Sequence, residues 1–196
     1  MPTTPDPAAG DDPAAGDPSP EQPAPSSSTN WRLIGRLAAI TVALTAADQL
    51  TKWWAERELA GREPIEIVGD LLQLRLLYNS GAAFSIATGL TWLLTLLVVV
   101  VIAAVIRASA KLGSTAWAIA LGLLLGGAFG NLIDRLFRDP GFPEGHVVDF
   151  IDYGGLFVGN VADIAITVAA VLIAILTWRG VSIDGVRRDS APKAGA

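Results

Sequence analysis

Two carboxylates near the C-terminal end of the chain lie in surroundings that a soluble protein would rarely give them. Asp149 and Asp163 are separated by fourteen positions in the stretch GHVVDFIDYGGLFVGNVADIAI (145–166), where most neighbours are Val, Ile, Phe, Ala and Gly. Apolar surroundings disfavour the charged form of a carboxylate. Two carboxylates within hydrogen-bonding distance share one proton, so one can activate a water while the other polarises a carbonyl oxygen. The spacing is compatible with such an aspartyl pair but does not establish it.

Further polar side chains fall at about the same depth, near one end of the apolar segments. They are Asp48 with Lys52, Asn79 in the turn NSGAAF, Asn131 with Asp134 and Arg135, and Asn160 ahead of Asp163. Ionisable groups at membrane depth are costly and are therefore candidates for function. Each cluster also has a structural interpretation. Asp48 and Lys52 are spaced to pair on one helix face, and Asn160 could cap a helix whose positive end stabilises Asp163.

Four charged or titratable groups in or near these clusters also have a structural interpretation. Asp134 and Arg135, at the end of an apolar segment, are more often charges at a membrane boundary than catalysts. We expect His146 to be a loop residue and Asp152 to be a solvated loop carboxylate.

Composition excludes several classes of protein. Of the 196 residues, 52% are hydrophobic and 17% are charged, a balance typical of a membrane protein. Cysteine is absent, which excludes thiol nucleophiles, disulfides and Cys-ligated zinc. A single histidine leaves no His-pair metal motif, and we predict neither a metal nor a cofactor. The net charge of −5 arises in residues 1–30, and no basic footprint for nucleic acid is visible.

The chain divides into three parts. Residues 1–30 are predicted to be a disordered, acidic, Pro- and Ala-rich extension, residues 31–180 a membrane domain, and residues 181–196 a basic tail. Four apolar segments approach the ~20 residues that cross a bilayer. They are about Leu33–Trp53, Gly89–Ile106, Leu112–Ile133 and Asn160–Trp178. The first segment is the weakest, because charged residues lie near both of its ends.

Two patterns indicate how the helices and the first external segment are built. PIEIVGDLLQLRLLY (64–78) alternates with period two around Val-Gly-Asp, which predicts a short hairpin on the membrane surface. In the third segment Gly122, Gly126 and Gly130 recur every four residues and offer a face for close helix packing. The predicted fold is an all-α membrane protein with four transmembrane helices and a small extracytoplasmic β-sheet.

Charge in the flanking segments predicts the orientation. Lys and Arg are more numerous before the first span, between the second and third, and after the fourth, while acids outweigh them on the other side. This bias places both termini in the cytoplasm and residues 54–88 and 134–159 outside. Asp48, Asp149 and Asp163 then lie toward the outer face, with Asp149 in the loop ahead of the fourth span.

Five motifs together carry a resemblance to a known family. They are DQLTK (48–52), NSGAAF (79–84), GNLIDR (130–135), VVDF (147–150) and NVAD (160–163). In this order, at the ends of predicted spans and over about residues 31–180, they resemble the lipoprotein signal peptidases, also called signal peptidase II. The resemblance implies a multi-pass enzyme of the bacterial cytoplasmic (inner) membrane. It would remove the signal peptide from prolipoproteins, cleaving before a cysteine that carries a diacylglyceryl group.

The resemblance also implies roles for individual residues. Asp149 and Asp163 would be the catalytic pair of a metal-independent aspartic endopeptidase. The residues that would bind substrate or support the site are Asp48, Lys52, Asn79, Gly81, Asn131, Arg135 and Asn160. The expected partners are diacylglyceryl-modified prolipoproteins and membrane lipid, with no nucleic acid and no obligate protein partner.

Three other functions are compatible with parts of the sequence. A Ser–Lys protease could use Lys52 with Ser80 or Ser85, although the chain offers no room for a sizeable external domain. A small transporter or proton relay could use the carboxylates, and it would be expected to show midplane charges and repeated halves. A scaffold that only binds lipid-modified proteins would tolerate the loss of either aspartate.

Overall fold

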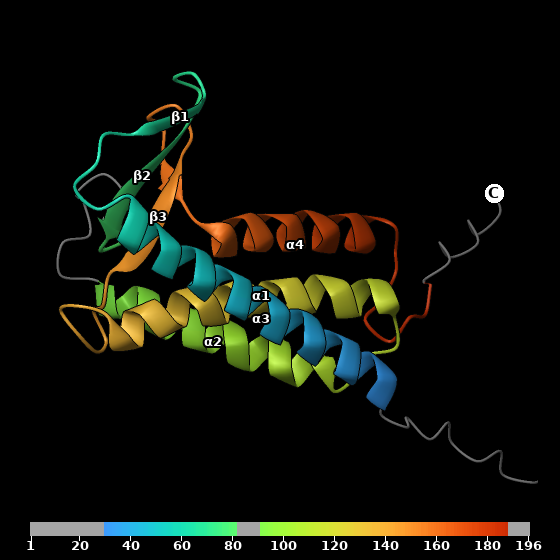
Figure 1. Cartoon of the computed structure of the whole chain (residues 1–196). Helices are drawn as coiled ribbons and strands as arrows, with labels where there is room; N and C mark the ends of the chain where they lie inside the picture. Colours follow the sequence, from blue (N-terminus) through green and yellow to red (C-terminus); the bar gives the residue numbers. More distant parts are fainter. Residues whose placement is uncertain (1–29, 82–90, 188–196) are drawn as a thin grey trace, which may run out of the picture.

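The computed structural model describes residues 30–81 and 91–187. Four helices form a bundle with a small sheet at one end (Figure 1). They are α1 (Trp31–Glu58), α2 (Thr91–Ser109), α3 (Thr115–Phe137) and α4 (Val161–Trp178), and all four are long and apolar enough to span a membrane. The described chain begins and ends at the end of the bundle away from the sheet, as an even number of crossings requires (Figure 1). The predicted four-helix architecture is confirmed.

Helix α3 is the centre of the bundle and packs against each of the other three helices. On its α1 side, the carbonyl oxygens of Gly122, Gly126 and Gly130 accept hydrogen bonds from Thr41, Thr45 and Gln49 at 3.3, 3.1 and 3.0 Å, respectively. A Cβ at any of the three glycines would lie within 3.0 Å of an α1 side-chain atom. The predicted small-residue face is therefore confirmed. The side chains that donate to it also recur every four residues, on α1.

A fourth glycine brings α4 against the neighbouring face of α3. A Cβ at Gly127 would lie 2.6 Å from the carbonyl oxygen of Ala162 and 2.7 Å from Ile166. Because Gly127 has no side chain, the first turn of α4 sits directly on α3. This contact brings Asn131, one turn further along α3, next to Asp163.

The sheet has four antiparallel strands in the order β1-β2-β3-β4. They are β1 (Ile65–Val68), β2 (Leu72–Asn79), β3 (Val147–Asp152) and β4 (Val158–Gly159). The predicted hairpin corresponds to β1 and β2. The prediction that Asp149 lies in a loop is wrong: Asp149 lies in β3, opposite Leu77 of β2. Nearly every residue of β3 is buried, so the strand lacks the alternation by which the hairpin was recognised.

Helix α1 extends further than its apolar core. We expected the span to end near Trp53, and the helix continues to Glu58. Its last turns pack beneath the sheet, where Ala55 and Leu59 join Phe150 in a small apolar cluster. Arg57 lies over the ring of Trp53, 3.9 Å from the centroid. The sheet therefore rests on an extension of a membrane helix.

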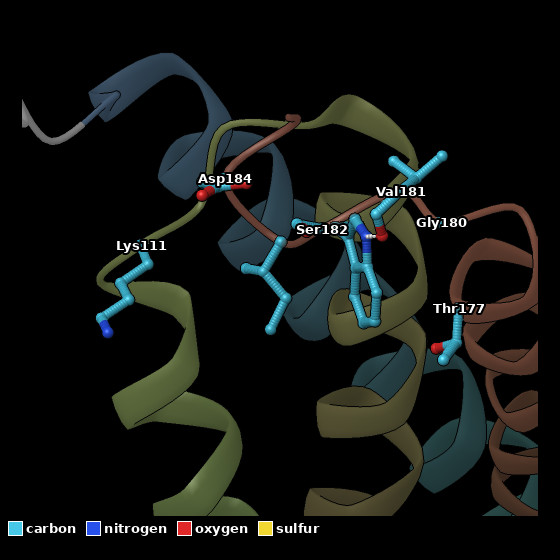
Figure 2. Close-up of a pocket in the computed structure, with 8 residues that line it drawn as sticks. Lys111, Thr177, Gly180, Val181, Ser182 and Asp184 are labelled. Atoms are coloured by element: carbon cyan, nitrogen blue, oxygen red, sulfur yellow. Dashed lines mark hydrogen bonds between the residues drawn. The ribbon is translucent and has the colours of Figure 1, made fainter. Parts of the chain in front are cut away.

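At the opposite end, the chain beyond α4 folds back onto the turn between α2 and α3. Trp117 donates its indole N–H to the carbonyl oxygen of Val181 at 2.9 Å (Figure 2). Gly113 donates its backbone N–H to Ile183, also at 2.9 Å. A Cβ at Gly113 would lie 2.0 Å from the carbonyl oxygen of Asp184, so only glycine allows this close approach.

Candidate active site

Asn160 joins the two aspartates that the sequence singled out. Its side-chain amide donates to Oδ1 of Asp149 at 2.6 Å, and its backbone N–H donates to Oδ2 of Asp163 at 3.1 Å. Its side-chain oxygen accepts the backbone N–H of Asp163 at 3.0 Å, which completes a capping box at the start of α4. The structural interpretation of Asn160 as a helix cap is correct. The same side chain also links β3 to α4, and thereby Asp149 to Asp163.

Two further amides complete the surroundings of this aspartate pair, defined as Asp149 and Asp163. Asn79, at the end of β2, donates to Oδ2 of Asp149 at 2.8 Å. Asn131 of α3 donates to Oδ1 of Asp163 at 3.0 Å. Asp149 is almost completely buried, with 1% of its surface exposed, whereas Asp163 is only partly buried. The described residues thus surround the pair with neutral amide donors and leave Asp163 the more accessible member.

Beside the pair lies a second group of charges, the charged cluster, formed by Asp48, Lys52 and Asp134. The ammonium of Lys52 lies 2.8 Å from a carboxylate oxygen of Asp48 and 2.8 Å from one of Asp134, and all three side chains are fully buried. Lys52 also donates to the side-chain oxygen of Asn131 at 2.9 Å. That bond aims the amide N–H of Asn131 toward Asp163.

Asp134 has a larger role than the sequence suggested. We expected a charge at the membrane boundary, but the side chain is completely buried, because Lys52 reaches it from α1. Its Oδ2 accepts the backbone N–H of Val148 at 3.2 Å, and its Oδ1 accepts from Arg138 at 2.7 Å. Asp134 therefore fixes β3 one residue before Asp149. The sequence indicated only one of these contacts, because Asp134 and Arg138 are spaced i, i+4 and can pair on one helix face.

Asp48 and Gln49 connect the charged cluster to the helix that carries Asp163. Asp48 accepts the backbone N–H of Ala162 at 2.9 Å. Gln49 donates to Asp134 at 3.2 Å, and sequence reasoning missed it. A Cβ at Gly130 would lie 2.4 Å from Asp48, so this glycine provides the space for the carboxylate. The spacing of Gln49 from Thr41 and Thr45 was the available signal.

A comparison with protein families identifies the family in which this arrangement belongs. The model of the family described as Signal peptidase (SPase) II matches residues 40–179. The chain belongs to the signal peptidase II family. The matched range contains the aspartate pair, the charged cluster and all three asparagines around the pair.

Curated relatives and solved structures agree with this membership. A lipoprotein signal peptidase of Rhodococcus jostii is 47% identical over 152 residues, which covers 78% of this chain and 77% of the relative. A lipoprotein signal peptidase of Mycolicibacterium smegmatis is 44% identical over 183 residues, with 91% and 75% covered. Two solved structures of a bacterial membrane enzyme, at 1.9 and 2.3 Å resolution, are 28% identical with TM-scores of 0.64 and 0.66. They cover 74% and 80% of this chain and 93% and 95% of their own.

The other predicted site residues of this signal peptidase II lie close to the pair without bonding to it. Arg135 is buried and donates to the carbonyl oxygen of Gly145 at 3.1 Å. Gly81, with φ +86°, donates its N–H to the side chain of Asn79 at 2.7 Å, and a Cβ there would lie 3.0 Å from Arg135. Asp48 and Lys52 are linked to the pair by hydrogen bonds through Ala162 and Asn131, respectively. The rest of the motif NSGAAF, residues 82–84, lies outside the described residues.

Burial changes the proton affinity of one member of the pair. The pKa of the Asp149 carboxyl is raised to about 6: burial and the charge of Asp163 raise it, and they outweigh the hydrogen bonds from Asn79 and Asn160, which lower it. Asp149 therefore retains its proton to higher pH than an exposed aspartate. This is the electrostatic condition under which two carboxylates can hold one proton between them.

Asp152 corrects another expectation from the sequence. We expected a solvated loop carboxylate, but Asp152 is the last residue of β3 and only 4% of its surface is exposed. It pairs with Arg75 of β2 at 2.5 Å and accepts the backbone N–H of Gly155 at 2.8 Å. Because Arg75 comes from the neighbouring strand, the partner could not be identified before the strand pairing was known. Within residues 30–81 and 91–187, no group of His, Cys, Asp or Glu is arranged to hold a metal.

Proposed function

We propose that this chain removes signal peptides from prolipoproteins and that Asp149 and Asp163 are its catalytic acid and base. Family membership supports the reaction, because the relatives that match most of the chain are lipoprotein signal peptidases. The assignment of the two aspartates rests on one observation: Asn160 hydrogen-bonds to both of them and thereby brings them together from different elements. The cleaved bond would be the one before the lipid-modified cysteine.

The chemistry would proceed through a water held at the pair. The ionised carboxylate takes a proton from the water, whose oxygen attacks the scissile carbonyl carbon, while the protonated carboxyl donates to the carbonyl oxygen. The tetrahedral intermediate then collapses: the C–N bond breaks and the amine leaves with a proton from one carboxyl of the pair. A hydroxyl of the intermediate returns its proton to the other carboxylate as the new carboxyl group of the product forms. Each turnover consumes one water and restores one shared proton. No cofactor is needed to balance this reaction.

The amides around the pair suit this proton exchange. Asn79, Asn131 and Asn160 each donate to a carboxylate oxygen and carry no charge. A cation in direct contact would strongly favour the ionised form of both aspartates, whereas amides permit the pair to gain and lose a proton. The charged cluster would act at a distance, since Lys52 orients Asn131 and Asp134 fixes β3. We assign Arg135 and Asn131 as donors to carbonyl groups of the substrate backbone.

The orientation is also part of the proposal. The sheet and the first turn of α4 lie at the end of the bundle opposite the described chain ends (Figure 1), and Asp149 and Asp163 belong to β3 and to that turn. With the charge bias of the flanking segments, this favours both termini in the cytoplasm and the pair at the outer face. A lipid-modified cysteine in the outer leaflet would then reach the pair without crossing the bilayer.

The contacts of Lys52 disfavour the Ser–Lys alternative. The ammonium group is fully buried between two carboxylates and the amide of Asn131, so it is not available to activate a serine. Of the two serines considered, Ser80 is described, and its backbone carbonyl accepts a hydrogen bond from the Thr91 hydroxyl. Ser85 lies outside the described residues. Nor does the family assignment favour a transporter or proton relay.

The proposal is tested by Asp149→Asn and Asp163→Asn variants purified from the membrane. We expect each to lose cleavage of a diacylglyceryl-modified prolipoprotein by a factor of roughly 10²–10⁴ or more, because each removes one partner in proton transfer. Thermal unfolding in detergent checks that the variants are folded. Asp70→Asn is the matched control, since it removes an exposed carboxylate between β1 and β2, outside the pair. Parental activity in either pair variant would refute the assignment.

A further inference from the structure

A cavity of about 280 Å³ lies against the accessible member of the aspartate pair. Its lining residues come from the loop after β3 and the first two turns of α4, and they are Tyr153, Phe157, Asp163, Ile164, Thr167 and Val168. Asp163 is the only ionisable carboxylate among them, and most of the remaining lining is apolar. The occupant of this cavity should therefore be apolar along most of its length, with one polar end at Asp163.

The roof of the cavity is a preformed aromatic pair. The rings of Tyr153 and Phe157 are stacked, with centroids 4.6 Å apart and planes 13° from parallel. Between them the chain makes a tight turn, in which Tyr153 donates its backbone N–H to Phe157 at 3.0 Å. Gly154 and Gly155 occupy this turn with φ of +64° and +74°. Asp152 anchors it by accepting the N–H of Gly155.

The floor of the cavity is the outward face of a membrane-spanning helix. Ile164, Thr167 and Val168 are spaced i, i+3 and i+4 on α4, and Ile164 and Val168 have 44% and 45% of their surface exposed. In a span, that exposed face contacts lipid. A chain of methylene groups could therefore enter from the bilayer without passing through water.

We propose that this cavity binds the first part of an acyl chain of the diacylglyceryl group on the substrate cysteine. The inference rests on the proposed function and adds the place where the lipid is recognised. The volume lies just below the range for ligand pockets, about 300–1,000 Å³, so it suits a segment of one chain and not a whole lipid. A small side chain on the signal-peptide side of the bond would leave most of it empty.

Gly159 controls the passage between the cavity roof and the aspartate pair. A Cβ there would lie 2.9 Å from the ring of Phe157 and 3.1 Å from Oδ2 of Asp163. The absence of a side chain leaves the carboxylate open toward the cavity. An acyl chain under the aromatic roof would thus place the glyceryl end of the modified cysteine beside Asp163, where the scissile bond must lie.

The first test fills the cavity from its floor. Val168→Phe should raise KM for a dipalmitoyl-modified prolipoprotein roughly tenfold, with a smaller effect on a dihexanoyl-modified one, because the added ring takes the space of the chain. Val171→Phe is the matched control, since Val171 is also lipid-exposed on α4 but does not line the cavity. Parental kinetics of Val168→Phe on both substrates would overturn the proposal. An equal loss of kcat on both substrates would also overturn it.

A second test needs no activity and no change in the cavity. A prolipoprotein that carries a photoreactive diazirine near the start of its acyl chain is irradiated with the Asp149→Asn variant in nanodiscs. We expect crosslinks in the peptide that contains Thr167 and Val168. A phospholipid with the same group is the competitor; crosslinking by the phospholipid alone would assign the cavity to bulk lipid and overturn the proposal. Full activity of Asp149→Asn, in contrast, would refute the proposed catalytic pair and leave this result standing.

Discussion

The charged cluster and the aspartate pair lie at the same end of one bundle, and each contains two aspartates. In the charged cluster, the ammonium of Lys52 contacts both carboxylates, and all three side chains are fully buried. In the pair, the hydrogen bonds that come from residues 30–81 and 91–187 are donated by asparagine amides or by a backbone N–H. A cation ties two carboxylates together through charge, whereas an amide can accompany either protonation state. The first arrangement suits a group that holds helices together, and the second suits the proton exchange that we propose for the pair.

The largest expected effect comes from removing the cation of the charged cluster. Lys52→Met would leave Asp48 buried without a counter-ion and Asp134 with Arg138 alone, and breaking a buried pair in this way costs about 3–5 kcal/mol. We expect the variant to unfold far below the parental temperature in detergent. Adding Asp48→Asn and Asp134→Asn to Lys52→Met should recover part of the loss. If Lys52→Met were as stable as the parent, the charged cluster would not be what holds the helices together, and its contrast with the aspartate pair would be lost.

The next effect should separate activity from stability. Asn160→Ala removes the side chain that joins the aspartate pair, and a displacement of catalytic groups by ~1 Å can cost 10²-fold. We expect kcat to fall about a hundredfold, while the lost helix cap lowers the free energy of unfolding by only about 1 kcal/mol. Measuring cleavage and thermal unfolding on the same preparation checks this. A large loss of stability with normal kcat in the folded fraction would contradict a positioning role.

A third prediction concerns the pH dependence of the pair. Asn79 donates to the carboxylate of Asp149, which lowers the pKa of that group, so Asn79→Val should raise it. The protonated form of the pair then persists to higher pH. The descending alkaline limb of kcat/KM should move upward by roughly one pH unit, given ~1.4 kcal/mol per unit. Tyr78→Phe is the control on the same strand, and its profile should match the parent. A shift to lower pH would contradict the assignment.

The smallest effect is expected at the far end of the bundle, where neither group reaches. Trp117→Phe removes one hydrogen bond to Val181 and should lower the free energy of unfolding by about 1 kcal/mol. Cleavage kinetics should not change. A change in KM or kcat would mean that the two ends are coupled, and that the contrast between the groups is not local.

Local patterns in the sequence were enough to predict the helices, the hairpin and the candidate pair. Apolar runs of membrane length gave the helices, and period-two alternation gave β1 and β2. Strand β3 was missed, because a strand buried on both faces shows no alternation. The burial of Asp134 was missed because its partner Lys52 is 82 residues away, so no local pattern records it. For each residue whose environment was predicted wrongly, that environment is set by contacts with a distant segment of the chain.

The regular row of hydrogen bonds between α1 and α3 raises a question of register. Thr41, Thr45 and Gln49 each contact a glycine carbonyl exactly 81 positions further along the chain. Because donors and glycines both repeat every four residues, a slip of one helical turn would preserve two of the three bonds. The row by itself therefore permits several alignments of nearly equal quality, as a uniform coiled-coil seam does.

The charged residues remove that ambiguity. A slip of one turn in one direction would carry Lys52 from Asn131 and Asp134 to the positions of Arg135 and Arg138, where like charges repel. A slip in the other direction would leave Lys52 beside Gly127 and Gly130, where α3 offers no anion and only Asp48 of its own helix remains. A single misaligned turn is thus penalised on either side, much as a buried polar residue selects one register in a designed bundle. Lys52 therefore selects one register between two helices whose other contacts repeat every four residues.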